Sequence, residues 1–587
     1  MLRRSVFTLI VILSAILSAC GNTPSQPNNP VTPTTGPSAN AIQISIIYAP
    51  ESEAYLKDQI AIFNQSYANG KNPLTGAALA ANEKPIFVTG KSGSSGTVMQ
   101  GIVNALIAPN NANVEKPTIF EPSVSHWLVL TNFQAGRDVF DLANSPATAL
   151  APVVMAIWES RLKAIQKANP GKEIGWQELL GVLNNPKGWE DYGFTGRRTV
   201  FYGHTDPFIS STALSTLMAE FYASARYNAN FTGRRLTLKE VNDNKVQDGV
   251  RSIENLIKHY SQRTTEFKEY IAQGPDYLDF VALEENDLIY INQGKTEYKP
   301  PERLVALYPK EGTFWHEHPF GIVNADWVTP DQREAAKTFT QFVLSEPVQQ
   351  AVLAAGFRPA NPKVPLGYPI VSDLGVDPDQ PKTVLDVPDP QVISAIQQSW
   401  SFVKKQADIW IVIDISGSMR DNDKLNQAKK AALVFLDKIE PQNRVGLMVF
   451  NADVSTLVEL DTLERNKPTL KEQVGGLIAN GGTALYDGTV EALKKFKTAE
   501  TGNRIRAVVI LSDGQDTESK NATLRDVISQ ISATREDANP VIVIPVAYGS
   551  DADVSILGSF ARASTTKVQS GDPSTIGKIL EIISSYF

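Results

Sequence analysis

Cysteine is almost absent from this sequence, because Cys20 is the only one among 587 residues. A disulfide within the chain is therefore impossible, and zinc sites built from several cysteines are excluded. An excess of basic residues is also missing, since the formal net charge is −8. Nucleic-acid binding requires a strongly basic surface, so we expect no nucleic acid among the partners.

The single cysteine follows a short apolar run near the N-terminus. Arg3 and Arg4 precede the run from Val6 to Ile16, which is shorter than a membrane-spanning helix and has the layout of a secretory signal. The next residues, Leu17-Ser18-Ala19-Cys20, resemble a bacterial lipobox. We predict a lipoprotein signal peptide over residues 1–20 and a lipid anchor on Cys20, with the protein facing outside the cytoplasm. An uncleaved N-terminal membrane anchor is the alternative.

Composition divides the rest of the chain, which is long enough for two to four domains. Residues 21–40 are rich in proline, asparagine, threonine and serine, so they cannot bury enough apolar area to fold and are expected to form a disordered tether. Strands and helices alternate from residue 42 to about 360, which indicates an α/β region with a mostly parallel sheet. Several prolines and aspartates then predict a linker over residues 366–405.

The last third of the chain contains unbroken apolar strands. They are expected at Ile409 to Ile413, Ala507 to Leu511 and Val541 to Val546. Apolar runs without alternation are typical of strands that are covered on both faces, as in a doubly wound sheet. The first run ends at Asp414 and the second ends just before Asp513, at the sheet edge where open α/β sheets bind ligands.

Five oxygen-bearing side chains follow these strands and one nearby loop. They belong to Asp414-Ile415-Ser416-Gly417-Ser418, to Asn480-Gly481-Gly482-Thr483 and to Ser512-Asp513-Gly514. Two carboxylates and three hydroxyls suit an octahedral divalent cation such as Mg²⁺ or Mn²⁺, with water in the remaining position. We therefore predict a metal site on Asp414, Ser416, Ser418, Thr483 and Asp513.

This pattern resembles the metal-ion-dependent adhesion site of von Willebrand factor A (VWA) domains, over residues 406–587. The resemblance implies a doubly wound, Rossmann-like fold whose metal accepts a Glu or Asp carboxylate from a protein partner. The alternatives are a VWA-like fold without metal and, for Asp487, a helix-end role instead of a part in the site. No general base lies near the motifs, so we expect a binding protein and no enzyme.

The region 42–365 resembles the type II periplasmic solute-binding proteins of bacterial ABC importers. The resemblance rests on short motifs: the loop at 91–97 (KSGSSGT), then HTDP at 204–207, FGIVN at 320–324 and GFRP at 356–359. It implies two α/β lobes, the first from 42–150 with 300–365 and the second from 150–300. A small polar solute would bind between the lobes, and the partner would be an importer permease.

Serines at expected helix starts are the candidate cleft residues of this module: Ser94, Ser95, Ser123, Ser210 and Ser211. For each of them taken alone, a simple helix N-cap is the favoured interpretation. His316 and His318 have the spacing of a zinc-binding pair on one strand face, although a packing role is favoured because no third ligand is evident. A hydrolase triad from a serine, His204 and Asp206 is rejected, since no nucleophile elbow or oxyanion hole is present.

Together these features predict a cell-envelope surface lipoprotein that binds a solute at its N-terminal module and a protein through its VWA site. One alternative is an adhesion or scaffold protein with no transported solute. The other is an assembly factor of a metal-chelatase-like enzyme complex, which export disfavours because the ATP-driven members of such complexes work in the cytoplasm.

Overall fold

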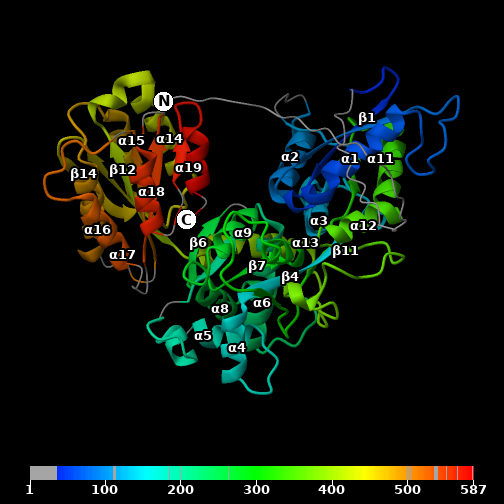
Figure 1. Cartoon of the computed structure of the whole chain (residues 1–587), viewed down its shortest axis with the longest axis horizontal. Coiled ribbons are helices and arrows are strands. Elements are labelled where there is room, and N and C mark those ends of the chain that lie inside the picture. Colours follow the sequence, from blue (N-terminus) through cyan, green and yellow to red (C-terminus); the bar gives the residue numbers. More distant parts are fainter. Residues whose placement is uncertain are drawn as a thin grey trace, which may run out of the picture.

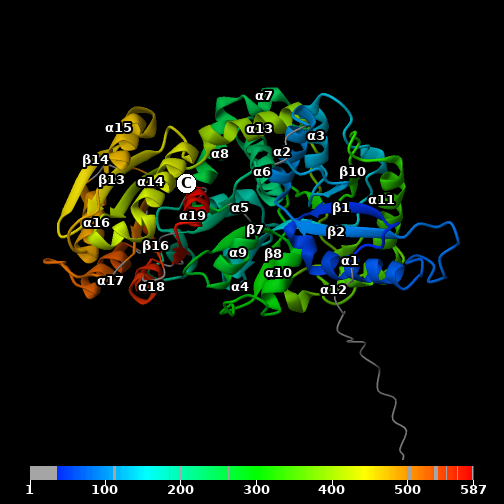
Figure 2. The same cartoon turned by 90° about the horizontal axis from the view of Figure 1, so that it is seen from above.

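The computed structural model describes residues 36–587 apart from 110–113, 184, 198–199, 262–263, 499–501, 503, 514, 535–539, 550–551, 565, 567 and 585. Figures 1 and 2 show three α/β bodies, here called the first lobe, the second lobe and the C-terminal body. The predicted signal peptide, Cys20 and most of the predicted tether lie outside the described residues. In the described part, no helix is both long and apolar enough to cross a membrane.

The first lobe is a small sheet with helices packed against it. Its elements are β1 (Ile42–Tyr48), η1 (Pro50–Ser52), α1 (Glu53–Ala68), β2 (Ile86–Ser92), α2 (Ser95–Ile107), β3 (Ile119–Glu121), α3 (His126–Ala135), η2 (Leu142–Asn144), β10 (Gly321–Ile322), α11 (Pro330–Val343) and α12 (Glu346–Ala354). The strand order is β10-β3-β1-β2, and only β10 is antiparallel to its neighbour. Phe63 of α1 and Phe339 of α11 meet in its core, with ring centroids 5.0 Å apart.

The second lobe is built around the long strand β4. Its elements are β4 (Ala149–Trp158), α4 (Glu159–Ala168), α5 (Trp176–Leu183), η3 (Gly188–Tyr192), β5 (Tyr202–Thr205), α6 (Ser211–Asn228), α7 (Leu238–Val241), α8 (Asn244–Glu254), β6 (Ile257–Ser261), α9 (Thr264–Ala272), β7 (Phe280–Glu284), α10 (Glu285–Asn292), β8 (Leu304–Leu307), β9 (Trp315–His316) and β11 (Arg358–Pro359). The strand order is β11-β4-β7-β5-β6, with β8 and β9 also paired to β4.

The chain returns from the second lobe to the first later than expected. The strands β8 and β9 still pair with β4, whereas β10 pairs with β3. The second lobe therefore extends to about residue 316 instead of 300, and residues 317–320 form the return crossing. The reason is that β4 has ten residues and offers a long edge to these short strands.

Residues 366–405, predicted as a linker, contain η4 (Ser372–Leu374) and α13 (Pro390–Val403). Helix α13 contacts α3 of the first lobe and α6, α7 and α8 of the second. Its side chains Ile393, Ile396 and Trp400 are buried. The segment before the C-terminal body thus packs against both lobes.

The C-terminal body is a sheet with helices on both faces. Its elements are β12 (Ala407–Asp414), η5 (Gly417–Asp423), α14 (Lys424–Lys438), β13 (Arg444–Phe450), β14 (Val454–Thr462), α15 (Leu463–Gly476), α16 (Leu485–Thr498), β15 (Ile505–Ser512), α17 (Leu524–Ala533), β16 (Val541–Tyr548), α18 (Val554–Ala563), β17 (Gln569–Gly571) and α19 (Ile576–Ser584). The strand order is β14-β13-β12-β15-β16-β17, parallel except for β14.

Alternate residues of β12 show how the two faces are covered. Ile409 and Ile411 join a core with α14, α15 and α19, whereas Trp410 and Val412 join a core with α16, α17 and α18. Because successive strand residues point to opposite faces, a strand buried on both faces must be apolar throughout. The predicted α/β architecture, with two lobes and a doubly wound C-terminal sheet, is confirmed.

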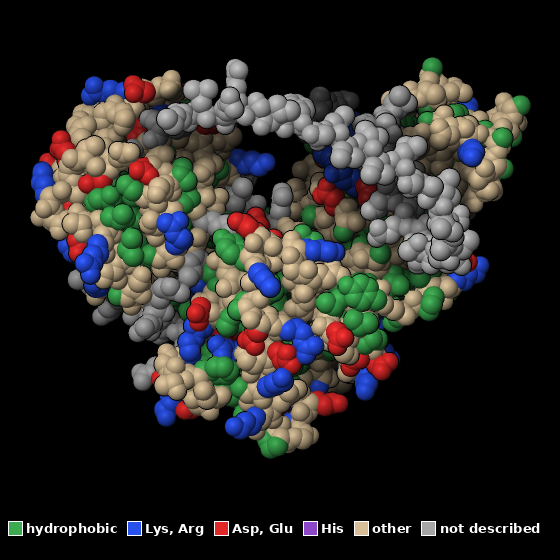
Figure 3. Space-filling model, viewed as in Figure 1, with side chains coloured by type: hydrophobic (Ala, Val, Ile, Leu, Met, Phe, Trp, Pro, Cys, Tyr) green, Lys and Arg blue, Asp and Glu red, His purple; other side chains and the backbone are tan. Residues whose placement is uncertain are grey.

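The C-terminal body rests on the second lobe, and in Figure 3 it stands apart from the first lobe. The Tyr586 carbonyl accepts a hydrogen bond from the Tyr260 amide at 3.3 Å, and the hydroxyls of Tyr586 and Tyr270 lie 3.3 Å apart. On the face shown in Figure 3, acidic and basic side chains are interspersed among the described residues. That pattern gives no support to a nucleic-acid surface on this face.

Candidate metal centre and interlobe cleft

The ends of two neighbouring strands bring the predicted carboxylates together. β12 and β15 are parallel neighbours in register, with Ile413 paired to Leu511. Asp414 is the last residue of β12, and Asp513 follows the last residue of β15. Because the carboxyl ends of parallel strands share one sheet edge, both side chains emerge at the same place.

A chain of hydrogen bonds joins four of the predicted ligands. The Ser416 amide donates to Asp414 Oδ1 at 2.8 Å, and the Ser512 hydroxyl donates to Asp414 Oδ2 at 2.7 Å. The hydroxyls of Ser416 and Ser418 lie 3.0 Å apart, and Ser418 donates to Asp513 Oδ1 at 2.8 Å. The oxygens of both loops therefore lie within hydrogen-bonding distance of one another.

The loop that carries Thr483 is held beside this cluster by its backbone. The Gly417 amide donates to the Gly481 carbonyl at 2.9 Å, and the Asn480 amide donates to the Ile415 carbonyl at 2.8 Å. Gly481 has a φ of +76°, a conformation that glycine adopts without strain. The carbonyl of Thr483 accepts hydrogen bonds from the 517 and 518 amides, so the loop is fixed from both sides.

Both carboxylates of this pair are buried, so their negative charges are costly unless a cation neutralises them. Asp414 is fully buried and Asp513 is 1% exposed. Burial raises the pKa of Asp414 to about 6 against hydrogen bonds from Ser416 and Ser512, and the Asp513 charge adds to the rise. Two buried carboxylates with neutral hydroxyls fit a divalent cation with oxygen ligands, because the ion would neutralise both charges.

Sequence reasoning missed Lys424, the first residue of α14. Its ammonium group lies 2.7 Å from Asp513 Oδ2, and the lysine is 2% exposed. No local pattern points to this ion pair, because 89 residues separate the partners. Lys424 supplies one positive charge, so the cluster keeps one net negative charge.

Asp487 has another role. Its carboxylate accepts hydrogen bonds from the Lys520 amide at 2.8 Å and from the Asn521 amide at 3.1 Å. It therefore fixes the 520–521 loop to the first turn of α16, as the helix-end alternative expects.

The predicted cleft serines meet across the two lobes. The hydroxyls of Ser95 and Ser211 lie 3.1 Å apart, and Ser95 accepts a hydrogen bond from the Ser123 amide at 3.3 Å. The Trp127 indole donates to Ser211 at 2.9 Å, and the Gly96 amide donates to the carbonyl of residue 209 at 3.1 Å. The lobes are in direct contact at this point.

Ser94 and Ser210 differ from these three. Ser94 lines a cavity of about 710 Å³ beside residues 91–104, with Phe208 of the second lobe and Gln397 of α13 on its other sides. Ser210 caps α6, accepting from the Ala213 amide at 3.2 Å, which is the N-cap role weighed as its alternative. Of the five serines, only Ser94 lines this cavity.

The two histidines at 316 and 318 are buried beside carboxylates. His318 places Nδ1 3.0 Å from Glu121 of the first lobe and Nε2 3.2 Å from Glu284 of the second. His316 Nδ1 lies 2.7 Å from Glu284. His318 therefore connects the lobes at the return crossing, which is the packing role favoured from the sequence. His204 lies near Glu254 and not within a serine–histidine–aspartate arrangement.

Two family models match the chain. Residues 143–376 match the bacterial extracellular solute-binding protein model, and residues 408–581 match the von Willebrand factor type A domain model. The first match covers the second lobe and runs into the segment predicted as a linker.

The curated relatives are similar in sequence to only part of this chain. The protein sll0103 of Synechocystis sp. is 27% identical over 114 residues, which is 19% of this chain and 26% of that protein. The chain spans 14% to 37% of the length of the curated relatives that it matches.

Two solved structures match parts of the chain. A periplasmic thiamin binding protein is 11% identical, covers 62% of this chain and 95% of its own, and has a TM-score of 0.41. A von Willebrand factor type A protein from Catenulispora acidiphila is 24% identical, covers 31% and 42%, and has a TM-score of 0.28. From the two family models, the chain combines a bacterial extracellular solute-binding module with a C-terminal VWA domain.

Proposed function

We propose that this protein acts outside the cytoplasm and binds an acidic side chain of a partner protein through a divalent cation in its VWA domain. Asp414, Ser416, Ser418, Thr483 and Asp513 would hold the cation. The observation that carries the proposal is the hydrogen-bonded chain from Asp414 through Ser416 and Ser418 to Asp513. It gathers hard oxygen donors at the edge of the sheet where ligands of α/β folds bind.

The charge balance explains why such a cation would accept a further carboxylate. Asp414 and Asp513 neutralise a divalent ion, but Lys424 already shares the charge of Asp513. The hydroxyl ligands are neutral, so the bound ion would remain electrophilic toward one more anionic oxygen. When bound, Mg²⁺ or Mn²⁺ supplies Lewis acidity, while the residues of the chain supply geometry and burial.

Calorimetric titration of the full chain with Mg²⁺ and Mn²⁺ tests this proposal. The wild type should bind one Mg²⁺ ion, and Asp414→Asn should abolish Mg²⁺ binding because it removes a charged ligand without changing the shape of the side chain. Asp487→Asn is the matched control, since this carboxylate of the same domain holds a loop. Equal binding by the wild type and Asp414→Asn would refute the metal site.

The open coordination position has its own measurement. Mn²⁺ bound to the full chain should enhance the relaxation of water protons, because water occupies the position left for the partner. Added acetate should reduce the enhancement as its carboxylate replaces the water. No effect of acetate would contradict the carboxylate-binding part of the proposal.

A second binding activity is favoured by the cavity beside Ser94. Its volume of about 710 Å³ falls within the range of small-molecule sites, and loops from both lobes and α13 line it. We propose that a small polar solute binds there. Such solutes should raise the melting temperature of the wild type but not of Ser94→Trp, whose indole would fill the cavity. A screen without any thermal shift would favour a scaffold role.

The location outside the cytoplasm is supported by the description of the matched solute-binding family as extracellular. We propose that a lipid on Cys20 anchors the protein to the cell membrane or envelope. Cys20→Ser should move the protein from the membrane fraction to the released fraction. Acylated, detergent-partitioning Cys20→Ser protein would exclude this anchor.

A further inference from the structure

Three side chains from separate elements converge in the interior of the second lobe. His204 lies on β5, Glu220 on α6 and Glu254 at the end of α8. One ligand atom from each lies within 4.8 Å of the ligand atoms of the other two. His204 is 2% exposed, and both glutamates are fully buried. None of these residues belongs to the cleft or to the VWA metal centre.

Each of the three groups is oriented through one of its two polar atoms. His204 Nδ1 lies 2.6 Å from the Thr205 carbonyl, which can only accept, so Nδ1 carries the hydrogen of a neutral ring and Nε2 keeps a free lone pair. Tyr202 donates its hydroxyl to Glu220 Oε1 at 3.3 Å. Tyr260 donates to Glu254 Oε2 at 2.8 Å.

The other polar atom of each group has no hydrogen-bond partner within the described parts of the chain. These atoms are His204 Nε2, Glu220 Oε2 and Glu254 Oε1, and the first and last lie 4.0 Å apart. Buried polar atoms without partners are costly, and carboxylates more so. Three acceptors that face one another require a positively charged occupant or protons.

A proton alone does not satisfy this arrangement. Burial raises the pKa of Glu220 well above its usual value, and the charge of Glu254 adds to the rise, so one proton could be shared between the two carboxylates. That proton would leave the lone pair of His204 Nε2 without a partner. A metal ion, in contrast, would use all three atoms at once.

We propose that His204, Glu220 and Glu254 form a binding site for one divalent transition-metal ion, with Zn²⁺ as the preferred ion. Two carboxylates neutralise its charge, and an imidazole nitrogen selects zinc over magnesium. Zinc bonds of about 2.0–2.2 Å require only a modest approach of the three ligand atoms. The hydrogen bonds from Tyr202, Tyr260 and the Thr205 carbonyl act as the supporting contacts that zinc ligands usually have.

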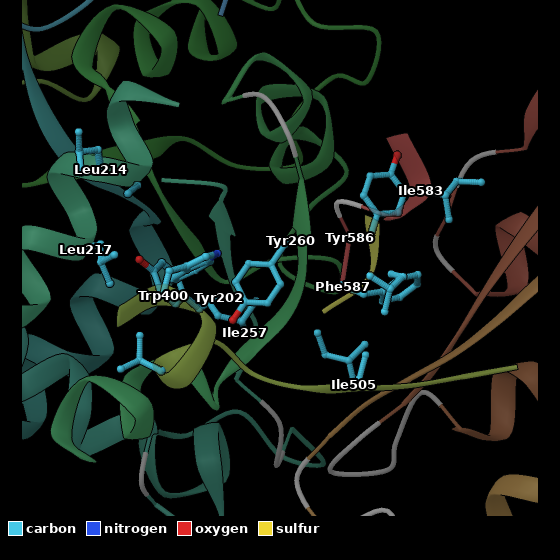
Figure 4. Close-up of a cluster of buried hydrophobic side chains, with 14 of the residues drawn as sticks. Tyr202, Leu214, Leu217, Ile257, Tyr260, Trp400, Ile505, Ile583, Tyr586 and Phe587 are labelled. Atoms are coloured by element: carbon cyan, nitrogen blue, oxygen red, sulfur yellow. The ribbon is translucent and has the colours of Figure 1, made fainter. Parts of the chain in front are cut away.

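The surroundings indicate a structural site. Figure 4 shows Tyr202, Tyr260 and Trp400 of α13 packed together, with Leu214 and Leu217 of α6 nearby. The ring centroids of His204 and Trp400 are 5.2 Å apart. Tyr260 also accepts a hydrogen bond from the Lys405 amide at 2.8 Å, just before β12. The ion would therefore tie β5, α6 and α8 together beneath the junction with the VWA domain.

The test uses the full chain with Asp414→Asn, so that the VWA centre does not contribute. Refolded with one equivalent of Zn²⁺ and dialysed, it should retain about one zinc per chain by elemental analysis. Glu254→Gln in this background should lower zinc affinity at least about 100-fold, because it removes a charged ligand while keeping the side-chain shape. Glu178→Gln is the control, since this buried carboxylate of the same lobe pairs with Lys310.

Cobalt substitution gives a second measurement if Glu254→Gln fails to fold. Co²⁺ in the Asp414→Asn chain should produce ligand-field absorption bands and X-ray absorption consistent with one imidazole and oxygen ligands. Zinc retention that is equal with and without Glu254→Gln would overturn the site. So would a refolded chain that retains neither zinc nor cobalt, because protons or water would then occupy the cluster.

Discussion

At the scale of single residues, Lys424 would decide how strongly the proposed metal site of the VWA domain attracts a cation. Its ammonium pairs with Asp513 Oδ2, while Ser418 donates to Oδ1 of the same carboxylate. In the metal-free protein this lysine offsets the repulsion between Asp414 and Asp513. After metal binding, the same ammonium would lie near a divalent ion of the same sign.

Replacement of Lys424 by methionine should therefore strengthen Mg²⁺ binding. We expect a decrease of about tenfold in Kd, because one unfavourable charge interaction in a buried site costs about 1.4 kcal/mol. Metal-free Lys424→Met should melt at a lower temperature, since two buried carboxylates then face each other without a cation. Calorimetry measures the first effect and thermal unfolding in EDTA measures the second.

The control is Lys429→Met on the same helix. The ammonium of Lys429 donates a hydrogen bond to the exposed Gly475 carbonyl and does not contact Asp513. Lys429→Met should change neither the Kd for Mg²⁺ nor the melting temperature in EDTA. Weaker Mg²⁺ binding by Lys424→Met would mean that the ammonium orients Asp513 for the ion, and the competition described above would be wrong.

Lys405 is a second buried lysine, and it predicts a pH dependence of stability. Burial, aided by the charge of Arg506, lowers its pKa from 10.5 to about 7. The unfolded chain therefore binds the proton more tightly than the folded one between these values, so stability falls as the pH falls from 10.5 toward 7. The difference between these two pKa values corresponds to about 5 kcal/mol. This is an upper bound for what the buried lysine costs in unfolding free energy below pH 7.

Lys405→Met should consequently stabilise the protein at pH 6–7, by a few kcal/mol. The gain should shrink as the pH rises from 7 toward 10.5 and should vanish only above 10.5, where the lysine is neutral in both states. Urea unfolding at pH 6, 8 and 10 measures this trend. Lys404→Met serves as the control, because Lys404 pairs with Glu440 and should not produce a gain. A gain of the same size at every pH would contradict the titration of Lys405.

At the scale of elements, the return crossing between the lobes depends on His318. Burial alone would raise the pKa of Glu284, but the charge of His318 and hydrogen bonds from His316 and His318 lower it below its usual range. The two carboxylates in turn raise the pKa of His318 well above its usual value, against the effect of burial. The stabilisation by His318 is therefore complete below about pH 6.5 and declines only as the pH rises through the raised pKa.

His318→Asn should remove this stabilisation without straining the backbone. His318 has a φ of +43°, in the left-handed region where asparagine is tolerated. The variant removes the charged ring from beside Glu121 and Glu284 and leaves only His316 next to Glu284, which should cost about 3–5 kcal/mol in unfolding free energy at pH 6. The loss should be smaller at high pH.

A matched control is His126→Asn, because burial lowers the pKa of His126 to about 3 and the ring is neutral. Its effect should not change between pH 6 and pH 9. A pH-independent loss in His318→Asn would show that packing, and not charge, supplies the stabilisation at the crossing.

The strands around the VWA centre could be predicted because their apolar runs are unbroken. The run expected at Ile409 to Ile413 is the middle of β12, and the one at Ala507 to Leu511 is the middle of β15. Burial on both faces leaves a local signal that one sequence is enough to detect. The same signal placed Asp414 and Asp513 at strand ends, where the structure has them.

Other elements leave weaker signals. Strand β14 is an edge strand with Val458 as its one buried residue, so its composition resembles that of a loop. The pairing of β8 and β9 with β4 depends on contacts about 150 residues away along the chain. The proposed zinc ligands His204, Glu220 and Glu254 come from three different elements. Their spacing in the sequence matches no metal-binding motif, so the sequence alone offered no reason to group them.

At the scale of the whole molecule, the VWA domain and the two lobes form a connected unit. Helix α13 packs against both lobes, and the VWA domain contacts the second lobe through the region around Tyr586. Figure 4 shows Tyr586 and Phe587 on one side of the cluster and Tyr260 and Trp400 on the other. A change in how the lobes meet would therefore reach the VWA domain through α13 and this contact.

Tyr586→Ala should separate the VWA domain from the second lobe while leaving each folded. The ring is 8% exposed, and its hydroxyl lies beside that of Tyr270, so its removal takes apolar and polar contacts from the junction. Tyr586→Phe is the control, because it loses only the hydroxyl contact. Phe587 is a less suitable position for this test. Its ring centroid lies 6.5 Å from that of Phe435 inside the VWA domain, so its loss would weaken that domain itself.

Calorimetry and small-angle X-ray scattering measure whether the VWA domain has separated from the second lobe. The wild type and Tyr586→Phe should unfold in one transition, whereas Tyr586→Ala should show a separate VWA transition that Mg²⁺ shifts upward by itself. The radius of gyration of Tyr586→Ala should also increase, because the VWA domain would then move relative to the lobes. A single transition with an unchanged radius would mean that α13 and the contact of Lys405 with Tyr260 hold the domains together without Tyr586.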